Sequence, residues 1–279
     1  MAPHKLTRIH VLLFIATFMT TTFAGALMNN VIPWEHPEKI YLGLPFSLTL
    51  LLILLTHELS HYVMSRRHNV DASLPYFIPA PSIIGTFGAV IKMRPPIPDR
   101  RSLIDIGASG PIGGFIIAVT ATVIGLSLSE IKPTGQLQEG LSFGSSILFD
   151  LLSKLVFKVD LEKYDVMLHP VAFAGWIGLL VTSLNLLPIG QLDGGHIIYA
   201  FFGEKHQWIS KGMIPVLIFL GIAYWSGWIV WAVIMIFLGY RHPPVVYPWI
   251  QLDRRRKIIG WIAFVIFILT FTPTPVKGL

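Results

Sequence analysis

Cysteine is absent from this chain of 279 residues, and charged residues are scarce, at 13% of the total. Without cysteine there is no disulfide framework, no thiolate ligand and no thiol nucleophile, so any metal ion must be held by His, Asp or Glu. A soluble domain of this length carries roughly 25% charged residues. Because 53% of the residues are hydrophobic, the composition indicates a polytopic membrane protein rather than a soluble enzyme.

Basic residues outnumber acidic ones and give a formal net charge of +6. In a soluble protein this excess could indicate nucleic-acid binding. In a membrane protein the positive-inside rule explains it better. We therefore expect the lipid bilayer, and no nucleic acid, as a partner; the oligomeric state is left open.

Seven apolar segments could form helices. They lie at residues 9–28, 42–64, 106–129, 170–187, 209–225, 228–240 and 258–272. About 20 apolar residues cross a bilayer as a helix, and the sixth and seventh segments are short, so we expect about six to seven transmembrane helices. The first segment lacks a persuasive cleavage site for a signal peptide, so we interpret it as a retained anchor.

Basic residues predict the orientation of these helices. They gather before the first segment, between the second and third, and between the sixth and seventh; the clusters are Lys5 and Arg8, then Arg66, Arg67, Lys92, Arg94, Arg100 and Arg101, then Arg241, Arg254, Arg255, Arg256 and Lys257. A cytoplasmic N-terminus places all three clusters in the cytoplasm. The loop at 130–169, with six acidic residues and four lysines, then lies outside.

Two stretches of the sequence are not expected to form simple transmembrane helices. Residues 144–158 predict an amphipathic surface helix, because one face collects the apolar side chains Ile147, Leu148, Leu151, Leu152 and Leu155. Residues 75–93, "PYFIPAPSIIGTFGAVIKM", contain three prolines that exclude a helix. There, "SII" and "AVIKM" flank "GTFG" and predict a short membrane-dipping β-hairpin, buried in protein or lining a cavity.

The stretch "LLILLTHELSHYVMSRR", residues 51–67, places polar groups in an otherwise lipid-soluble helix. Its H-E-x-x-H pattern consists of His57, Glu58 and His61. The two histidines stand one turn apart, about 40° around the helix axis, so both imidazoles can reach one metal ion. Glu58 flanks the same face and can act on a water molecule there. Because ionisable groups inside a membrane are costly unless paired or ligated, the pattern predicts a zinc hydrolase site.

A tetrahedral zinc site with one open position needs a third protein ligand. We predict Asp193, which lies in "NLLPIGQLDGGHIIYAFFG" on the same cytoplasmic side as His57. His196, three residues on, is the alternative, either as a ligand or beside the site. The residues expected to break the helix there are Pro188, Gly190, Gly194 and Gly195. Three candidates less suited by position are Asp105, Glu130 and His169.

With both segments placed, the chain resembles the site-2 protease family, the intramembrane zinc metalloproteases. The resemblance covers residues 42–204 and includes "HELSH", "GTFGAVI", "GASGPIGGF" and "NLLPIGQLDGGH". It implies that one Zn²⁺ per chain is bound by His57, His61 and Asp193, with Glu58 as the general base. It also implies that Asn185 holds the substrate or the developing oxyanion, for which the alternative is a helix-packing hydrogen bond.

The resemblance assigns a role to the hairpin as well. A transmembrane substrate helix satisfies its backbone internally, so its cleavage requires unwinding and a strand edge with which to pair. The residues expected to contact the substrate are Gly85, Thr86, Phe87, Gly88, Ala89 and Val90. The alternative is a cavity-lining loop without substrate contact. The "GASGPIGG" stretch, which lacks a Walker lysine, predicts close helix packing rather than phosphate binding.

We therefore expect an all-α polytopic membrane protein, a single protease domain over 1–279 in a prokaryotic cell membrane. A three-helix catalytic core would occupy residues 42–204, with accessory helices at 9–28 and 208–272. No PDZ-like or nucleotide-binding regulatory domain is recognised. The expected function is hydrolysis of peptide bonds in or near transmembrane segments of membrane proteins, in regulated intramembrane proteolysis. The alternatives are a metal transporter, which paired repeats would favour, and a non-catalytic metal-binding scaffold.

Overall fold

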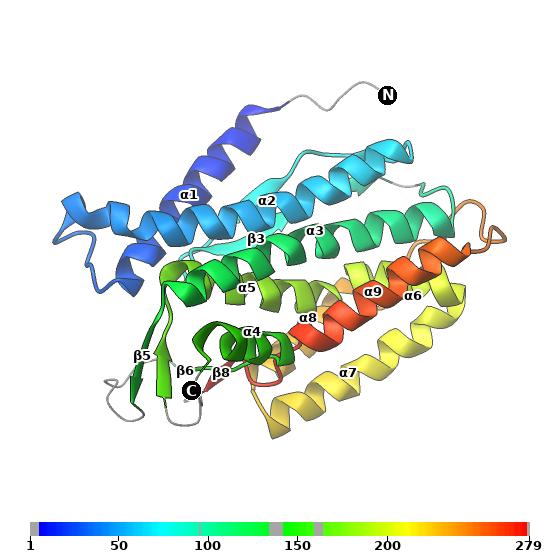
Figure 1. The fold of residues 1–279 in the computed structure, drawn as a ribbon. Helices are drawn as coiled ribbons and strands as arrows, with labels where there is room; N and C mark the ends of the chain where they lie inside the picture. Colours follow the sequence, from blue (N-terminus) through cyan, green and yellow to red (C-terminus); the bar gives the residue numbers. More distant parts are fainter. Residues whose placement is uncertain (1–5, 95, 134–141, 159–163, 278–279) are drawn as a thin grey trace. The chain divides into compact units, whose positions relative to one another are not determined.

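The computed structural model describes residues 6–94, 96–133, 142–158 and 164–277, and it is mostly helical (Figure 1). The helices are α1 (Arg8–Met28), α2 (Leu44–Arg67), α3 (Arg100–Ser127), α4 (Ile147–Phe157), α5 (Pro170–Asn185), α6 (Asp193–Phe202), α7 (His206–Ala223), α8 (Gly227–Leu238) and α9 (Arg254–Thr270), with 3-10 turns at η1 (Pro37–Gly43) and η2 (Gly203–Lys205). The strands are β1 (Asp71–Ala72), β2 (Tyr76–Pro79), β3 (Thr86–Val90), β4 (Met93–Arg94), β5 (Glu130–Pro133), β6 (Ser142–Phe143), β7 (Tyr164–Met167) and β8 (Val276–Lys277).

Each of the seven apolar segments contains a helix, which confirms a mostly helical membrane protein. Within the described ranges, four helical stretches are long and apolar enough to cross a membrane: Arg8–Met28, Pro37–Arg67, Arg100–Ser127 and Asp193–Ala223. A helix satisfies its backbone groups internally, which is what a bilayer requires. The expected six to seven spans stay a prediction, because α5 and α8 are apolar but shorter.

The chain divides into two compact units. The first comprises Met1–Met93, Gly113–Gln138 and Leu151–Leu179, and the second comprises Arg94–Ile112, Glu139–Asp150 and Leu180–Leu279. Both α3 and α5 contribute residues to each unit. The expectation of one domain over 1–279 stays a prediction.

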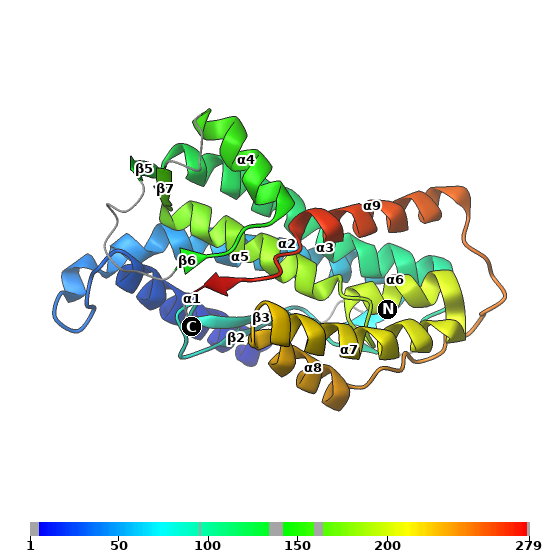
Figure 2. The ribbon, with the colours of Figure 1, turned by 90° about the horizontal axis from the view of Figure 1, so that it is seen from below.

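In the first unit, β2 and β3 form an antiparallel pair beside α1 (Figure 2). Tyr76 lies opposite Val90, and Ile78 lies opposite Gly88. The prediction of the first arm and of the turn was wrong, because "SII" belongs to the connecting turn and "GTFG" supplies the start of β3; the first two residues of "AVIKM" do lie in β3. Gly85 and Gly88 have φ angles of +81° and +101°, so these glycines shape the entry to the strand and a twist within it.

Helix α1 supports this hairpin along much of its length. Thr20 Oγ1 donates a hydrogen bond of 2.6 Å to the Gly85 carbonyl. The Phe14 ring meets the Phe77 ring edge-on, with centroids 5.1 Å apart. A Cβ atom at Gly85 would lie 2.5 Å from the Thr20 carbonyl oxygen. The lack of a side chain at Gly85 therefore permits a close approach to α1. At Gly88 a Cβ would meet nothing within 4 Å, so its positive φ is what requires glycine there.

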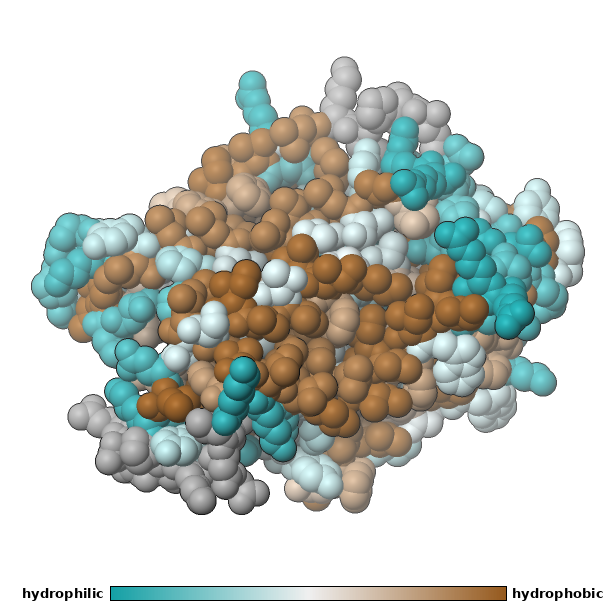
Figure 3. All heavy atoms as spheres, in the orientation of Figure 1, coloured by the Kyte–Doolittle hydropathy of each residue, from teal (hydrophilic) through white to brown (hydrophobic). Residues whose placement is uncertain are grey.

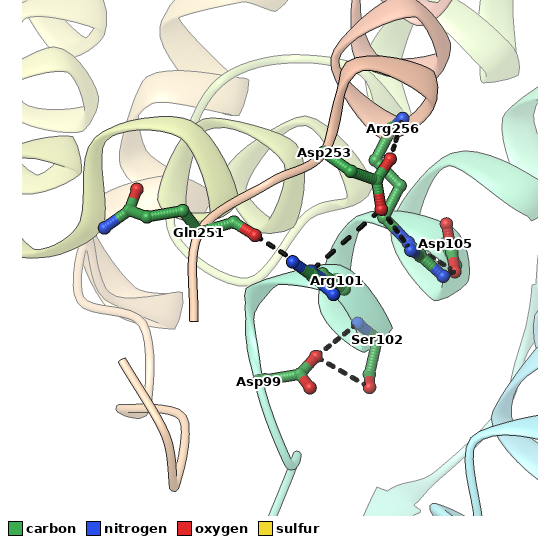
Figure 4. A network of polar contacts seen from close by, with 7 residues as sticks. All are labelled: Asp99, Arg101, Ser102, Asp105, Gln251, Asp253 and Arg256. Carbon is green, nitrogen blue, oxygen red and sulfur yellow. Dashed lines mark hydrogen bonds and ion pairs between the residues drawn. The ribbon is translucent and has the colours of Figure 1, made fainter. Parts of the chain in front are cut away.

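In the second unit, a polar network joins the first turns of α3 and α9 (Figure 4). Asp105 Oδ2 accepts hydrogen bonds from Arg256 Nε at 2.9 Å and Nη2 at 2.7 Å. Asp253 caps α9 by accepting from the Arg256 backbone N–H at 2.9 Å. Arg101 Nε donates to the Gln251 carbonyl at 2.8 Å. The basic run before the last apolar segment therefore fixes helix positions as well as providing an orientation signal.

The surface of α9 changes character along its length. Figure 3 shows hydrophilic residues over its first turn and hydrophobic residues beyond it. Its exposed apolar side chains include Trp261, Phe264, Val265 and Ile268. This pattern is typical of a helix whose apolar surface faces lipid.

The predicted amphipathic helix is α4, and its apolar stripe is divided in the structure. Leu148 and Leu152 are buried, whereas Ile147, Leu151 and Leu155 are exposed. An exposed apolar edge of this kind is consistent with a helix lying at a membrane surface.

Candidate metal centre

Helix α2 presents the H-E-x-x-H motif in the interior of the first unit. Nε2 of His57 lies 3.2 Å from Nε2 of His61, and the two ring centroids are 4.9 Å apart. Both histidines are 4% exposed, and Glu58 is 7% exposed. The predicted one-turn spacing therefore brings two imidazole nitrogens together, with a buried carboxylate on the same helix.

This pair of nitrogens fits a zinc ion. Zinc–imidazole bonds are about 2.0–2.1 Å long, so two of them at a tetrahedral angle place their nitrogen atoms roughly 3.3–3.4 Å apart. The distance of 3.2 Å between His57 and His61 is close to that value. Neutral nitrogen lone pairs are also the donor type that zinc accepts from histidine.

Glycines of α3 allow its backbone to approach this part of α2. A Cβ atom at Gly113 would lie 2.3 Å from Ser60 Oγ, and one at Gly114 would lie 3.1 Å from His57 Nδ1. Larger residues would force the helices apart and displace the His57 ring. The structure thus confirms that the "GASGPIGG" stretch serves close helix packing.

Asp193 begins α6 in the second unit, after a short loop at 186–192. Cβ atoms at Gly194 and Gly195 would lie 2.1 Å from the Leu186 carbonyl oxygen and 2.2 Å from that of Gly190. The prediction that Gly194 and Gly195 break the helix was wrong, because both lie inside α6 and let the loop fold onto it. A carboxylate at this position is stabilised by the helix N-terminus.

Three alternative ligands have other surroundings. Asp105 is bound by Arg256 through two hydrogen bonds. Glu130 lies on β5 with its side chain 69% exposed. The Nδ1 atom of His169 accepts from the Val171 backbone N–H at 3.2 Å, and burial lowers the pKa of His169. Asp105 and His169 therefore have partners within the chain, and Glu130 lies at the surface.

Two other predicted site residues lie close in sequence to the α5–α6 loop. Asn185 is the last residue of α5 and is half-buried. His196 lies in the first turn of α6, and its Nδ1 is 2.6 Å from Nε2 of His242. Sequence reasoning missed this contact, because 46 residues separate the two histidines.

The hairpin exposes one arm. Phe87 is 75% exposed and Val90 is 50% exposed, while Thr86 is buried and its Oγ1 donates to the Ile78 carbonyl at 2.7 Å. Substrate contact by residues 85–90 stays a prediction. The support of this hairpin by α1 was also missed, although the "TTT" run at 20–22 within an apolar segment is a signal that could have indicated it.

Comparisons with known proteins place these features in context. A model of the family described as Peptidase family M50 matches residues 45–224. Two Arabidopsis thaliana proteins, "Probable zinc metalloprotease EGY1, chloroplastic" and its EGY2 counterpart, are 32% and 28% identical over 83% and 90% of this chain. The matches cover 43% and 45% of those relatives, so the chain spans less than half their length. The EGY1 protein of Oryza sativa subsp. japonica is 36% identical over 58% of this chain and 28% of its own length. No solved structure matches.

The chloroplast names of these relatives give no support to the expected prokaryotic cell membrane.

Proposed function

Because the chain belongs to peptidase family M50, we propose that it is an intramembrane zinc metalloendopeptidase. The observation that carries this proposal is the buried pair of His57 and His61 nitrogens, 3.2 Å apart, with Glu58 on the same helix. Four helices with the length and composition of membrane spans support a site at membrane depth. The family membership agrees with the resemblance found in the sequence.

We assign three chain ligands to one zinc ion: His57, His61 and Asp193. The donor set supports this assignment, because two imidazole nitrogens and a carboxylate oxygen form a group that could hold a metal ion. Three protein ligands leave a fourth position open for water or substrate, as in catalytic zinc sites. When bound, zinc polarises the scissile carbonyl and makes a water molecule more acidic.

Two side chains of the protein, Glu58 and Asn185, act directly on the reacting groups. The Glu58 carboxylate accepts a proton from the attacking water and returns it to the nitrogen of the departing amine. The Asn185 amide donates a hydrogen bond to the oxygen on which negative charge develops. Burial of Glu58 keeps bulk water from competing for its proton.

The proposed substrates are transmembrane segments of other membrane proteins. A helical segment hides its scissile carbonyl, and the exposed arm of the hairpin, residues 86–90, offers backbone groups to an unwound segment. The basic clusters support a cytoplasmic N-terminus, which would place the site toward the cytoplasmic side.

The test compares two carboxylate variants of the full chain with a transmembrane substrate in vesicles. Wild type should hold about one zinc ion per chain. Glu58→Gln should keep the zinc but cleave about 10²–10⁴-fold more slowly, because a general base is lost. Glu130→Gln, which changes the exposed carboxylate on β5, should cleave as wild type does.

If Glu58→Gln cleaved at the wild-type rate, the protease mechanism would be wrong. Zinc-loaded wild type without any cleavage would favour the scaffold alternative, and zinc flux into vesicles would favour a transporter.

A further inference from the structure

A second group of histidines is buried in the second unit. His196 lies on α6, His206 begins α7, and His242 lies in the segment after α8; they are 6%, 0% and 5% exposed. The Tyr199 ring stacks on the His242 ring, with centroids 4.5 Å apart. Residues 46 and 36 positions earlier in the chain therefore contact His242.

The proton on His206 follows from its two backbone partners. Its Nδ1 lies 2.9 Å from the Gly203 carbonyl oxygen, and a carbonyl can only accept, so Nδ1 carries the proton. Its Nε2 lies 3.2 Å from the backbone nitrogen of His242, which can only donate, so Nε2 accepts. Both contacts are satisfied by one neutral tautomer of His206.

The protons on His242 and His196 follow by the same reasoning. Nδ1 of His242 lies 2.5 Å from the Pro243 carbonyl oxygen and must donate, which leaves Nε2 of the neutral ring as an acceptor. Nδ1 of His196 lies 2.6 Å from that Nε2 and must therefore donate. In the neutral His196 ring the unprotonated nitrogen is then Nε2.

The surroundings keep His242 neutral. Burial lowers the pKa of His242 to about 3, and the neighbouring His196 and His206 lower it as well. A neutral His242 is required for its Nε2 to accept from Nδ1 of His196.

The geometry points to a positioning role for His242 and His206: we propose that they hold His196 as its Nδ1–H tautomer, with Nε2 as a hydrogen-bond acceptor at the catalytic site. The position of His196 supports this, because it lies one helical turn after Asp193, on neighbouring parts of the α6 surface. Gly107 allows α3 to lie close to this part of α6, because a Cβ atom there would be 2.8 Å from His196 Cβ and 3.5 Å from the Asp193 carbonyl oxygen.

The acceptor suits a donor group of the substrate or of the attacking water, since an unprotonated Nε2 cannot donate. The catalytic part of this proposal rests on the proposed function. The assignment of the tautomer depends only on contacts within the second unit. The tautomer and the catalytic role can therefore be refuted independently of each other.

The first test uses Asn and Gln as partial mimics of histidine in the full zinc-loaded chain. Asn places its amide near the position of Nδ1, whereas Gln reaches the position of Nε2. His196→Gln should cleave within a few-fold of wild type, and His196→Asn should lose about tenfold in kcat, the size expected for one hydrogen bond. Both should retain wild-type zinc content.

The reverse order would overturn the proposal, since a merely structural His196 needs only its Nδ1 donor. Loss of zinc in both variants would also overturn it and make His196 a ligand. At His242 the same logic predicts that Gln, which can accept in place of Nε2, retains more kcat than Asn.

The second test reads the tautomer directly and requires no cleavage. Solid-state NMR of the full chain labelled with ¹⁵N-histidine should show His196 protonated at Nδ1, with the signal assigned by its loss in His196→Gln. A signal from His196 protonated at Nε2 would refute the proposed tautomer, whether or not the chain is a protease. The expected tautomer in a chain that cuts no substrate would support the positioning of His196 by His242 and His206 and reject the proposed function.

Discussion

The two units each bury a histidine group, and the groups are built differently. In the first unit, Nε2 of His57 faces Nε2 of His61 across 3.2 Å, on a single helix. In the second unit, His206 and His242 each donate to a backbone carbonyl, and their remaining nitrogens accept from N–H groups. The backbone thus assigns the protons in the second group. The first group brings two imidazole nitrogens within 3.2 Å of each other, an arrangement suited to a metal ion.

The largest expected effect comes from removing one member of the first group. His61→Ala should lower zinc affinity by more than about 100-fold, since even loss of a residue behind a ligand costs 10–100-fold, and cleavage should fall with it. Zinc content after dialysis against a weak chelator measures the effect. His68→Gln, at the C-terminal end of the same helix, is the matched control and should keep its zinc. Equal zinc retention in His61→Ala and wild type would remove the distinction between the two groups.

A smaller effect is expected from the second group. His206→Phe removes the acceptor of the buried His242 N–H and the donor to the Gly203 carbonyl. Leaving such groups unsatisfied should lower the free energy of unfolding by about 1–3 kcal/mol, measured by denaturant unfolding in detergent. Zinc content should not change. The control His36→Phe, at an exposed histidine, should leave the free energy of unfolding unchanged. Loss of zinc in His206→Phe would contradict the interpretation that the second histidine group is held by protein contacts alone.

The third effect concerns acid stability and is spread over several pH units. His242 has a pKa of about 3 in the folded chain, against an ordinary value of 6.5. Between these values the unfolded chain binds more protons, so the free energy of unfolding should decrease by up to about 1.4 kcal/mol per pH unit as the pH falls. Unfolding measured at several pH values from 4 to 7 should show this slope in wild type and a flatter one in His242→Gln. Identical slopes would show that His242 does not remain neutral.

Much of the helical framework and of the first histidine group could be predicted. Long apolar runs predict helices because a bilayer leaves few other ways to satisfy the backbone. The i, i+4 spacing of His57 and His61 determines their closeness once α2 is a helix, so local geometry sufficed.

The second group and the hairpin depend on information that local patterns lack. The contact of His196 with His242 depends on the path of the chain through α7 and α8, and no periodicity encodes it. In the hairpin, "GTFG" was interpreted as a turn because glycine favours turns. In the structure Gly85 precedes the strand and packs on α1, where its carbonyl accepts a hydrogen bond from Thr20. Gly194 was likewise interpreted as a helix breaker, although it provides room for the Leu186 carbonyl.

The hydrogen bond between Thr20 and the Gly85 carbonyl has a consequence for how the chain assembles. Synthesis runs from the N-terminus, so α1 is complete before residues 76–90 leave the ribosome. The hairpin is marginally stable on its own. It therefore folds against an existing helix, whose Thr20 and Phe14 side chains contact it. In this order of assembly, α1 serves as a template for the strand pair, and truncating it would leave the hairpin without the surface on which it folds.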